Sequence, residues 1–156
     1  MKTRLIAVGK LQTMYEPAQK EFLKRLTRYG GVELVETADE PVPQTLSDAQ
    51  RQNAITKEWE RQRRQIGARD VLIFLDASGE KLTSEALAQR LDAWQQQGPV
   101  TFLLGGSLGF PREALSQAHA VLSLSNMTFT HSLARVVLLE QLYRAFRILH
   151  HEPYHK

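Results

Sequence analysis

The sequence predicts an α/β fold, a mostly parallel β-sheet flanked by helices, in a single domain that spans residues 1–156. Strand-like apolar runs alternate with helix-like segments along the whole chain. Two of these runs, residues 70–76 and 100–104, are apolar on both faces, as central strands of a parallel sheet are. The length allows one sizeable hydrophobic core but not two independent ones.

Apolar periodicity and the positions of Gly and Pro predict the other elements. The predicted strands cover 4–8, 32–37 and 121–124. The first predicted helix has Pro17 in its first turn and ends at Gly30-Gly31. The second runs from Ser47 to about Gln65 and has Gly67 as its cap; its apolar stripe consists of Ala54, Ile55, Trp59 and Ile66.

A turn is predicted at Ser78-Gly79. Three further helices are predicted, from Thr83 or Ser84 to about Gln97, from Pro111 to about His119, and from about Ser132 to Leu149.

Composition limits the classes of function. The chain has a formal net charge of +3, which permits a polyanionic partner without requiring one. It contains no cysteine, which excludes disulfides, cysteine nucleophiles and thiolate metal sites. The apolar runs are far shorter than a membrane span, and no signal-peptide core follows the first residues. We therefore expect a cytoplasmic protein with no membrane contact.

Three strand ends are candidates for a ligand site, because parallel sheets bind ligands at the carboxyl ends of their strands. These ends are Leu75-Asp76, Gly105-Gly106 and Leu124. The sequence GGSLG at 105–109 lets the backbone approach a ligand closely, but it is neither the dinucleotide fingerprint nor a Walker loop. A ligand loop and a tight structural turn both fit it. For Asp76, capping a turn is favoured over binding a hydroxyl or an amine.

The C-terminal stretch is basic and rich in histidine. Residues 131–156 hold four of the five histidines, and four Lys or Arg residues against two Glu residues. Tyr143 and Tyr154 are interleaved with this charge, a combination found on RNA-binding surfaces. An amphipathic helix with a solvated basic face explains the same pattern. The histidines lack the spacing of a metal site, so we expect no metal ion.

Several motifs together resemble one family. They are FLD at 74–76, LLGGSLGFP at 103–111 and LSLSNMTFTHSLARVVLLEQLYRAFRILHHEPYHK at 122–156, with LIAVGK at 5–10 near the start. The chain resembles, over its whole length, the RlmH family of ribosomal large-subunit pseudouridine methyltransferases, which belong to the SPOUT class. The most specific part is T-H-S-L-A-R-V-x-L-x-E-Q-L-Y-R-A combined with the terminal P-Y-H-K.

This resemblance implies a C-terminal deep trefoil knot that binds S-adenosyl-L-methionine and an obligate homodimer. It also implies methylation at N3 of a pseudouridine in 23S ribosomal RNA, on assembled ribosomes. The cofactor-binding residues that it implies agree with the three strand ends already singled out. They are Leu75, Gly105, Leu124, Ser125, Asn126, Met127, Thr128 and Phe129.

Three positions depart from the family pattern. Ser107-Leu108 stands where members commonly have Pro-Glu, so no carboxylate role passes to Leu108. The tail of members often reads N-H-P-Y-H where this chain has HEPYH at 151–155, and no role is carried over to Glu152. Thr130 replaces a usual proline, which would loosen the loop before His131.

Methyl transfer from a sulfonium to an imide nitrogen requires alignment of donor and acceptor and removal of a proton. The candidates on the acceptor side are His155, Tyr154 and Arg144. Arg135 is a candidate phosphate contact or stabiliser of the imide anion. We favour His155 as the proton acceptor, because the ordinary pKa of histidine suits neutral pH. Glu140, one helical turn before Arg144, is expected to orient that arginine.

Two alternatives come from other classes of function. The chain could be a ribosome-associated RNA-binding module without catalysis, or a SPOUT methyltransferase acting on another RNA such as transfer RNA. The apolar stripe of the last helix also has two interpretations, a homodimer contact or part of the core. The stripe consists of Val137, Leu138, Leu142 and Phe146.

Overall fold

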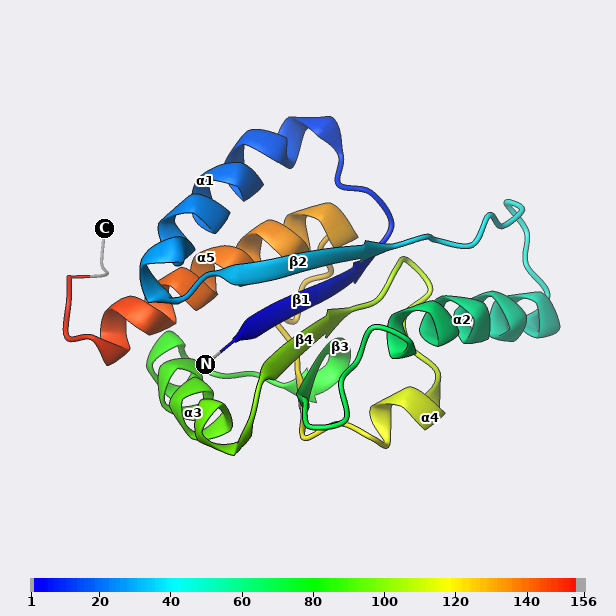
Figure 1. Cartoon of the computed structure of the whole chain (residues 1–156). Coiled ribbons are helices and arrows are strands. Elements are labelled where there is room, and N and C mark those ends of the chain that lie inside the picture. The colour runs from blue at the N-terminus through cyan, green and yellow to red at the C-terminus, as the bar shows by residue number, and fades with distance from the viewer. Residues whose placement is uncertain (1, 154–156) are drawn as a thin grey trace.

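A five-stranded parallel sheet forms the centre of the protein (Figure 1). The computed structural model describes residues 2–153. The strand order is β2-β1-β4-β3-β5, and every neighbouring pair is parallel. The elements, in chain order, are β1 (Thr3–Val8), a 3-10 turn (Thr13–Tyr15), α1 (Glu16–Leu26), a second 3-10 turn (Thr27–Tyr29), β2 (Val32–Thr37), α2 (Asp48–Arg63), β3 (Val71–Glu80), α3 (Ser84–Gln97), β4 (Val100–Leu104), α4 (Arg112–Leu115), β5 (Ala120–Leu122) and α5 (His131–Leu149).

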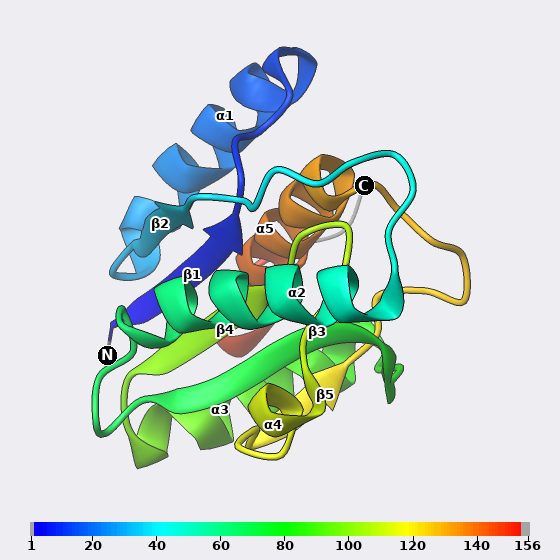
Figure 2. The same ribbon diagram turned by 90° about the vertical axis from the view of Figure 1, so that its right-hand side faces the viewer.

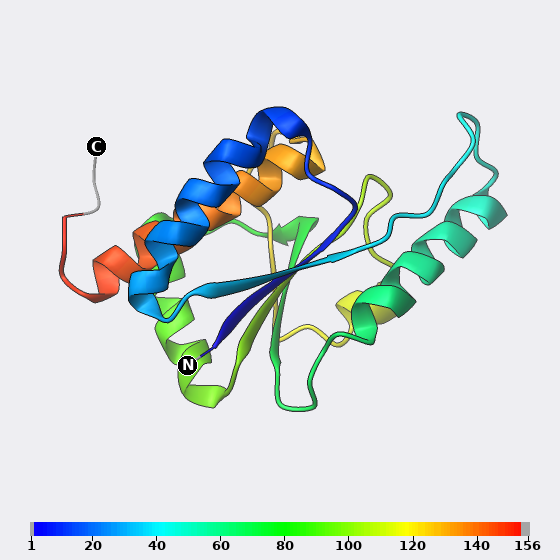
Figure 3. The same ribbon diagram turned by 45° about the horizontal axis from the view of Figure 1, so that its top comes forward.

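Helices cover both faces of the sheet (Figures 2 and 3). Helices α1, α3 and α5 pack on one face, where the larger hydrophobic cluster lies, and α2 and α4 pack on the other. Alternate residues of one strand enter opposite clusters: Leu5 joins the larger one and Ile6 the smaller one. This explains why the central strands are apolar on both faces, and it confirms the predicted fold class.

The sequence-based boundaries are close for most elements. Pro17 lies in the first turn of α1, Ser47 caps α2 in a capping box, and Thr83 caps α3. In α5 the Thr130 side chain accepts a hydrogen bond from the Leu133 N–H at 3.2 Å. The threonine that replaces proline therefore supplies a helix cap. None of the helices between residues 2 and 153 is long and apolar enough to cross a membrane.

The turn predicted at Ser78-Gly79 is wrong, because β3 continues to Glu80. A Cβ atom at Gly79 would lie 2.5 Å from the backbone of Leu122, so this glycine permits close contact with β5 rather than a reversal of the chain. Two predicted boundaries also extend too far. Helix α4 ends at Leu115, and α2 ends at Arg63, before the proposed cap.

The apolar stripe of α5 belongs mainly to the core. Leu138, Leu142 and Phe146 are at most 4% exposed and join the larger hydrophobic cluster, whereas Val137 is only partly buried. Helix α5 lies between α1 and α3 and packs against both of them (Figure 3). The interpretation of this stripe as core is therefore correct, and a dimer contact has to use other residues.

Candidate functional site

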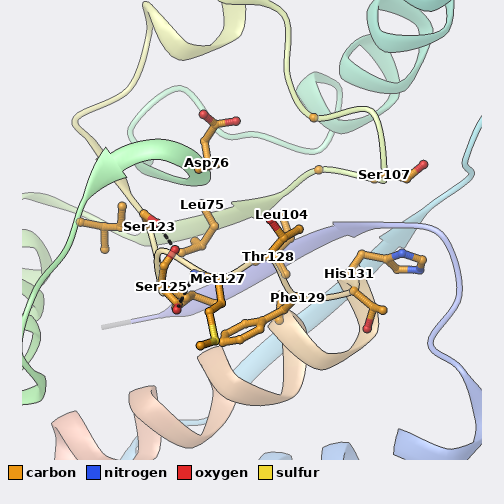
Figure 4. A pocket seen from close by; sticks show the side chains of 18 of the residues that line it. Leu75, Asp76, Leu104, Ser107, Ser123, Ser125, Met127, Thr128, Phe129 and His131 are labelled. Carbon is orange, nitrogen blue, oxygen red and sulfur yellow. Dashed lines mark hydrogen bonds between the residues drawn. The ribbon is translucent and has the colours of Figure 1, made fainter.

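A cavity of about 610 Å³ lies at the carboxyl ends of β3, β4 and β5 and is called the loop cavity here. Figure 4 shows side chains from all of these strand ends around it. Three loops line the cavity with the start of α5, and they contain every cofactor-binding residue that the resemblance implies. The lining residues include Leu75, Asp76, Gly105–Gly109, Leu124–Phe129 and His131.

The glycine loop between β4 and α4 is a compact turn. Gly106 and Gly109 form a β-bridge, in which the Gly109 N–H donates to the Gly106 carbonyl at 3.1 Å. Gly109 has a φ of +82°, a conformation that side chains rarely adopt. A Cβ atom at Gly105 would lie 3.2 Å from the Gly109 carbonyl oxygen. The loop is therefore both a tight turn and a cavity wall, which joins the two interpretations that the sequence left open.

The loop from Ser123 to Thr130 forms the opposite wall. Its own side chains hold its shape, because the Ser123 hydroxyl donates to the Ser125 carbonyl at 2.9 Å and the Ser125 hydroxyl accepts from the Met127 N–H at 2.9 Å. Met127 itself is 77% exposed beside the cavity (Figure 4). Between residues 2 and 153 it is one of three large apolar side chains that are exposed.

Asp76 has the capping role that the sequence favoured. Its carboxylate accepts hydrogen bonds from the backbone N–H of Ser78 at 3.0 Å and from the Ser78 hydroxyl. The same residue lines the loop cavity, so its side chain shapes that wall while it holds the strand end.

A second cavity of about 800 Å³ adjoins the loop cavity. The two share Gln12, the Gly106–Leu108 segment and His131. Its floor includes the buried carboxyl group of Glu58, which the sequence reasoning did not single out. Burial raises the pKa of Glu58 above its ordinary value, and the negative charge of Asp39 adds to the rise. No local pattern marks this residue, because α2 places it under the glycine loop through tertiary contact.

Arg135 is 1% exposed in α5. Its guanidinium donates to the Gly9 carbonyl at 3.1 Å and to the side chains of Glu36 and Gln19. It joins α5 to the ends of β1 and β2 and is not among the residues that line either cavity. A contact between Arg135 and a phosphate or an imide anion stays a prediction.

Arg144 lies on the same helix, thirteen residues beyond His131. Ala134 is the last residue of α5 that lines the loop cavity, so at 1.5 Å per residue Arg144 lies about 15 Å along the helix from it. The Arg144 Nη2 atom is 2.7 Å from Glu140 Oε2, as the expected orienting pair requires. Within one chain, Arg144 is therefore too distant to act on an occupant of the loop cavity.

The segment after α5 is held by side-chain contacts. The Glu152 carboxylate accepts from the Tyr29 hydroxyl at 2.7 Å and pairs with Arg28 at 2.5 Å. Arg147 donates to the Pro153 carbonyl at 2.7 Å through its Nε atom. The hydrogen bond from Tyr29 lowers the pKa of Glu152, with Arg28 and Arg147 adding to the effect. Glu152 thus has a structural role that the family pattern did not imply.

Two of the predicted catalytic residues, Tyr154 and His155, lie outside the described residues. Tyr143, the other aromatic residue of the basic stretch, is partly buried. Its ring packs against Phe22 and Tyr29, with centroid distances of 6.4 and 6.2 Å, and the guanidinium of Arg25 lies 5.6 Å from its centroid. Tyr143 therefore serves the contact between α1 and α5 in this chain.

Comparison with known proteins identifies the class to which this α/β fold belongs. The family model described as "Predicted SPOUT methyltransferase" matches residues 1–155. A solved structure described as "a probable methylase family protein" from Haemophilus influenzae has the same fold, with a TM-score of 0.56 and 12% identity. The alignment covers 96% of this chain and 66% of that one. The chain is a methyltransferase of the SPOUT family.

Its relatives define the family more closely. Proteins called "Ribosomal RNA large subunit methyltransferase H" from Acetivibrio thermocellus and Halothermothrix orenii are 43% and 45% identical to it, over the full length of both chains in each case. The chain belongs to the same family as these proteins.

Proposed function

We propose that this protein uses S-adenosyl-L-methionine to methylate N3 of a pseudouridine in 23S ribosomal RNA, on assembled ribosomes in the cytoplasm. The observation that carries the proposal is the loop cavity, which three strand-end loops build in a chain of the SPOUT family. The name shared by the relatives, a large-subunit ribosomal RNA methyltransferase, supports the substrate. One domain over residues 1–156, with the C-terminal trefoil knot, would carry the activity.

The loop cavity fits the proposed cofactor in size and chemistry. Its volume of about 610 Å³ lies within the usual range for small-molecule sites. Leu75 and Phe129 offer apolar surface to an adenine ring. The absence of a Cβ atom at Gly105 permits the tight packing against Gly109 and Phe110 that shapes the cavity wall. The remaining contacts would come from Leu124, Ser125, Asn126, Met127 and Thr128. When bound, the sulfonium supplies an activated methyl group, so we propose no metal ion.

The acceptor side needs groups that remove the proton from N3 or stabilise the negative charge that this leaves on the base. We assign this work to His155, Tyr154 and Arg144, with Glu140 holding the arginine in place. Because Arg144 is about 15 Å along α5 from the loop cavity of its own chain, it would serve the cavity of a second copy. A homodimer that pairs the C-terminal end of α5 with the partner's loop cavity meets this requirement. Met127, exposed beside the cavity, is available for the contact.

The test is mass-spectrometric mapping of 23S ribosomal RNA from a strain that lacks this gene. Ribosomes from the strain are incubated with the purified protein and S-adenosyl-L-methionine, and each pseudouridine is examined for a new methyl group. We expect one new methylation at N3. Stoichiometric cofactor binding without methylation of ribosomes would shift the proposal to another RNA. RNA binding without cofactor binding would indicate a non-catalytic binding module.

Light scattering at micromolar concentration tests the homodimer. We expect twice the 17.8 kDa mass of one chain. A stable monomer that still methylates ribosomes would contradict the shared site.

A further inference from the structure

The second cavity lies directly beside the proposed cofactor site. Gly106, Ser107, Leu108, Gln12 and His131 line both cavities, and Figure 4 shows Ser107 and His131 on one side of the loop cavity. A molecule in the second cavity would therefore lie next to the wall of the first. Methyl transfer requires this adjacency, since the acceptor nitrogen has to approach the donor in line.

The walls of the second cavity are acidic, although the chain as a whole is basic. Four carboxylates line it, together with Lys10 and His131, and they are Glu36, Asp39, Glu40 and Glu58. Glu36 forms an ion pair with Arg135, and Glu40 forms one with Arg61. The other two carboxyl groups, of Asp39 and Glu58, offer oxygen atoms that accept hydrogen bonds. The N–H groups of a nucleobase fit this chemistry.

Glu58 is the most constrained of these carboxylates. It is 5% exposed, and its Oε2 atom accepts a hydrogen bond from the Glu40 N–H at 2.9 Å. Its Oε1 atom has no hydrogen-bond partner among residues 2–153. A buried carboxylate oxygen without a donor is costly, so the arrangement leaves an acceptor to be satisfied. Burial accordingly raises the pKa of this carboxyl group.

Gly106 separates Glu58 from the shared wall of the two cavities. A Cβ atom at this glycine would lie 3.2 Å from Glu58 Oε1 and 3.1 Å from a methyl group of Val8. The missing side chain therefore leaves no side-chain atom of residue 106 next to this oxygen. Because the oxygen is buried, the glycine loop has to shift before a donor can reach it.

We propose that the second cavity receives the base of the target nucleotide and that Glu58 Oε1 accepts a hydrogen bond from the N1–H group of pseudouridine. This inference rests on the proposed function. Pseudouridine carries N–H groups at both N1 and N3, whereas N1 of uridine is bonded to the ribose. With N3 directed to the loop cavity, N1 is the second donor, and an acceptor for it distinguishes pseudouridine from uridine. Glu58 is thus a specificity-determining residue.

The experiment compares two substrates, ribosomes with pseudouridine at the target position and ribosomes with uridine there. Single-turnover rates are measured for the wild type, Glu58→Gln and the control Glu60→Gln. Glu60 is on the same helix, but its side chain is 39% exposed and pairs with Arg63. In Glu58→Gln the amide oxygen is needed by the Glu40 N–H, so the NH₂ group would face the base and oppose its N1–H.

We expect the wild type and Glu60→Gln to prefer pseudouridine equally. Glu58→Gln should lose about 10- to 100-fold of that preference, the range for a hydrogen bond to a charged group. Calorimetry should give the same cofactor affinity for all three proteins. An unchanged preference in a folded Glu58→Gln protein would overturn the inference alone. A wild type that methylates neither substrate would overturn the proposed function and, with it, this inference.

Gly106→Ala is a second variant in case Glu58→Gln does not fold. Its Cβ atom would obstruct the approach to Glu58 Oε1 while leaving the carboxylate in place. Loss of preference for pseudouridine is again the expected result. A preference retained at the wild-type level, with the cofactor bound normally, would also overturn the inference.

Discussion

The two ends of helix α5 hold functional residues in different ways. At its N-terminal end, His131 borders two cavities that share the glycine loop, one lined largely by apolar and small polar residues and the other by carboxylates. At its C-terminal end, ion pairs and aromatic contacts hold the chain: Arg144 with Glu140, and Glu152 with Tyr29 and Arg28. The first region is suited to binding a small molecule closely, and the second to placing charged groups at a distance from it. The comparison separates donor binding from acceptor chemistry.

Truncation after Pro153 should give the largest effect and the sharpest separation of the two regions. If residues 154–156 act on the acceptor, methyl transfer should fall by about 10²–10⁴-fold, the usual contribution of general acid–base catalysis. Cofactor affinity should not change, because the loop cavity lies at the other end of α5. Single-turnover assays on ribosomes at saturating enzyme provide the measurement.

His155→Ala alone should reproduce most of that loss if this residue is the general base. A mere phosphate contact would instead weaken RNA binding, more strongly at high salt, and leave the saturated rate nearly unchanged. The assay is therefore repeated at two salt concentrations. Wild-type rates for the truncated protein would move the acceptor role to Arg135 and Arg144.

Gly105→Val should have the complementary effect on the other region. The branched side chain would press against Gly109 and Phe110, since even a Cβ atom lies 3.2 and 3.3 Å from them. Overpacking should displace the glycine loop, which is a wall of the loop cavity, and should lower cofactor affinity by roughly tenfold or more. Calorimetry on a variant with a wild-type circular dichroism spectrum tests this. Unchanged affinity would remove the glycine loop from the site.

The sequence predicted the first region far better than the second. Apolar runs identified β3 and β4, and the glycine cluster marked the loop, because local backbone requirements appear directly in local sequence. The contact between Glu152 and Tyr29 joins residues 123 positions apart, and no local pattern encodes it. The turn predicted at Gly79 was wrong for the same reason, because the small size of this glycine serves packing against Leu122. Glu58 has no local pattern to mark it either.

Glu152→Gln should have a smaller effect than the truncation. The amide keeps an acceptor for the Tyr29 hydroxyl but loses the ion pair with Arg28, which is 64% exposed. We expect the rate of methyl transfer to fall by less than about tenfold, as for a largely solvated pair. Because contacts lower the pKa of Glu152, their stabilising effect is present above the ordinary carboxyl pKa and is lost as pH falls.

A pH series from 7 down to 3, which crosses the ordinary carboxyl pKa of 4.5, separates positioning by Glu152 from general stability. The wild type should lose activity toward acid faster than Glu152→Gln. Glu21→Gln is the matched control, because Glu21 also pairs with an arginine, at 2.7 Å, on the surface of α1. Parallel pH profiles for all three proteins would show that Glu152 does not position the C-terminal segment.

The smallest expected effect is on stability, where Glu58 and Glu152 should differ in sign. Burial raises the pKa of Glu58, so ionisation of this carboxyl group is less favourable in the folded state than in the unfolded state. Its contribution to stability is fully present below the ordinary carboxyl pKa and is lost as pH rises through the raised value. Glu58→Gln, which cannot ionise, should therefore unfold roughly 2–4 °C above the wild type at pH 8 and show no gain at pH 4. Thermal unfolding followed by circular dichroism gives both midpoints. An equal shift at both pH values would show that ionisation of Glu58 does not destabilise the folded state.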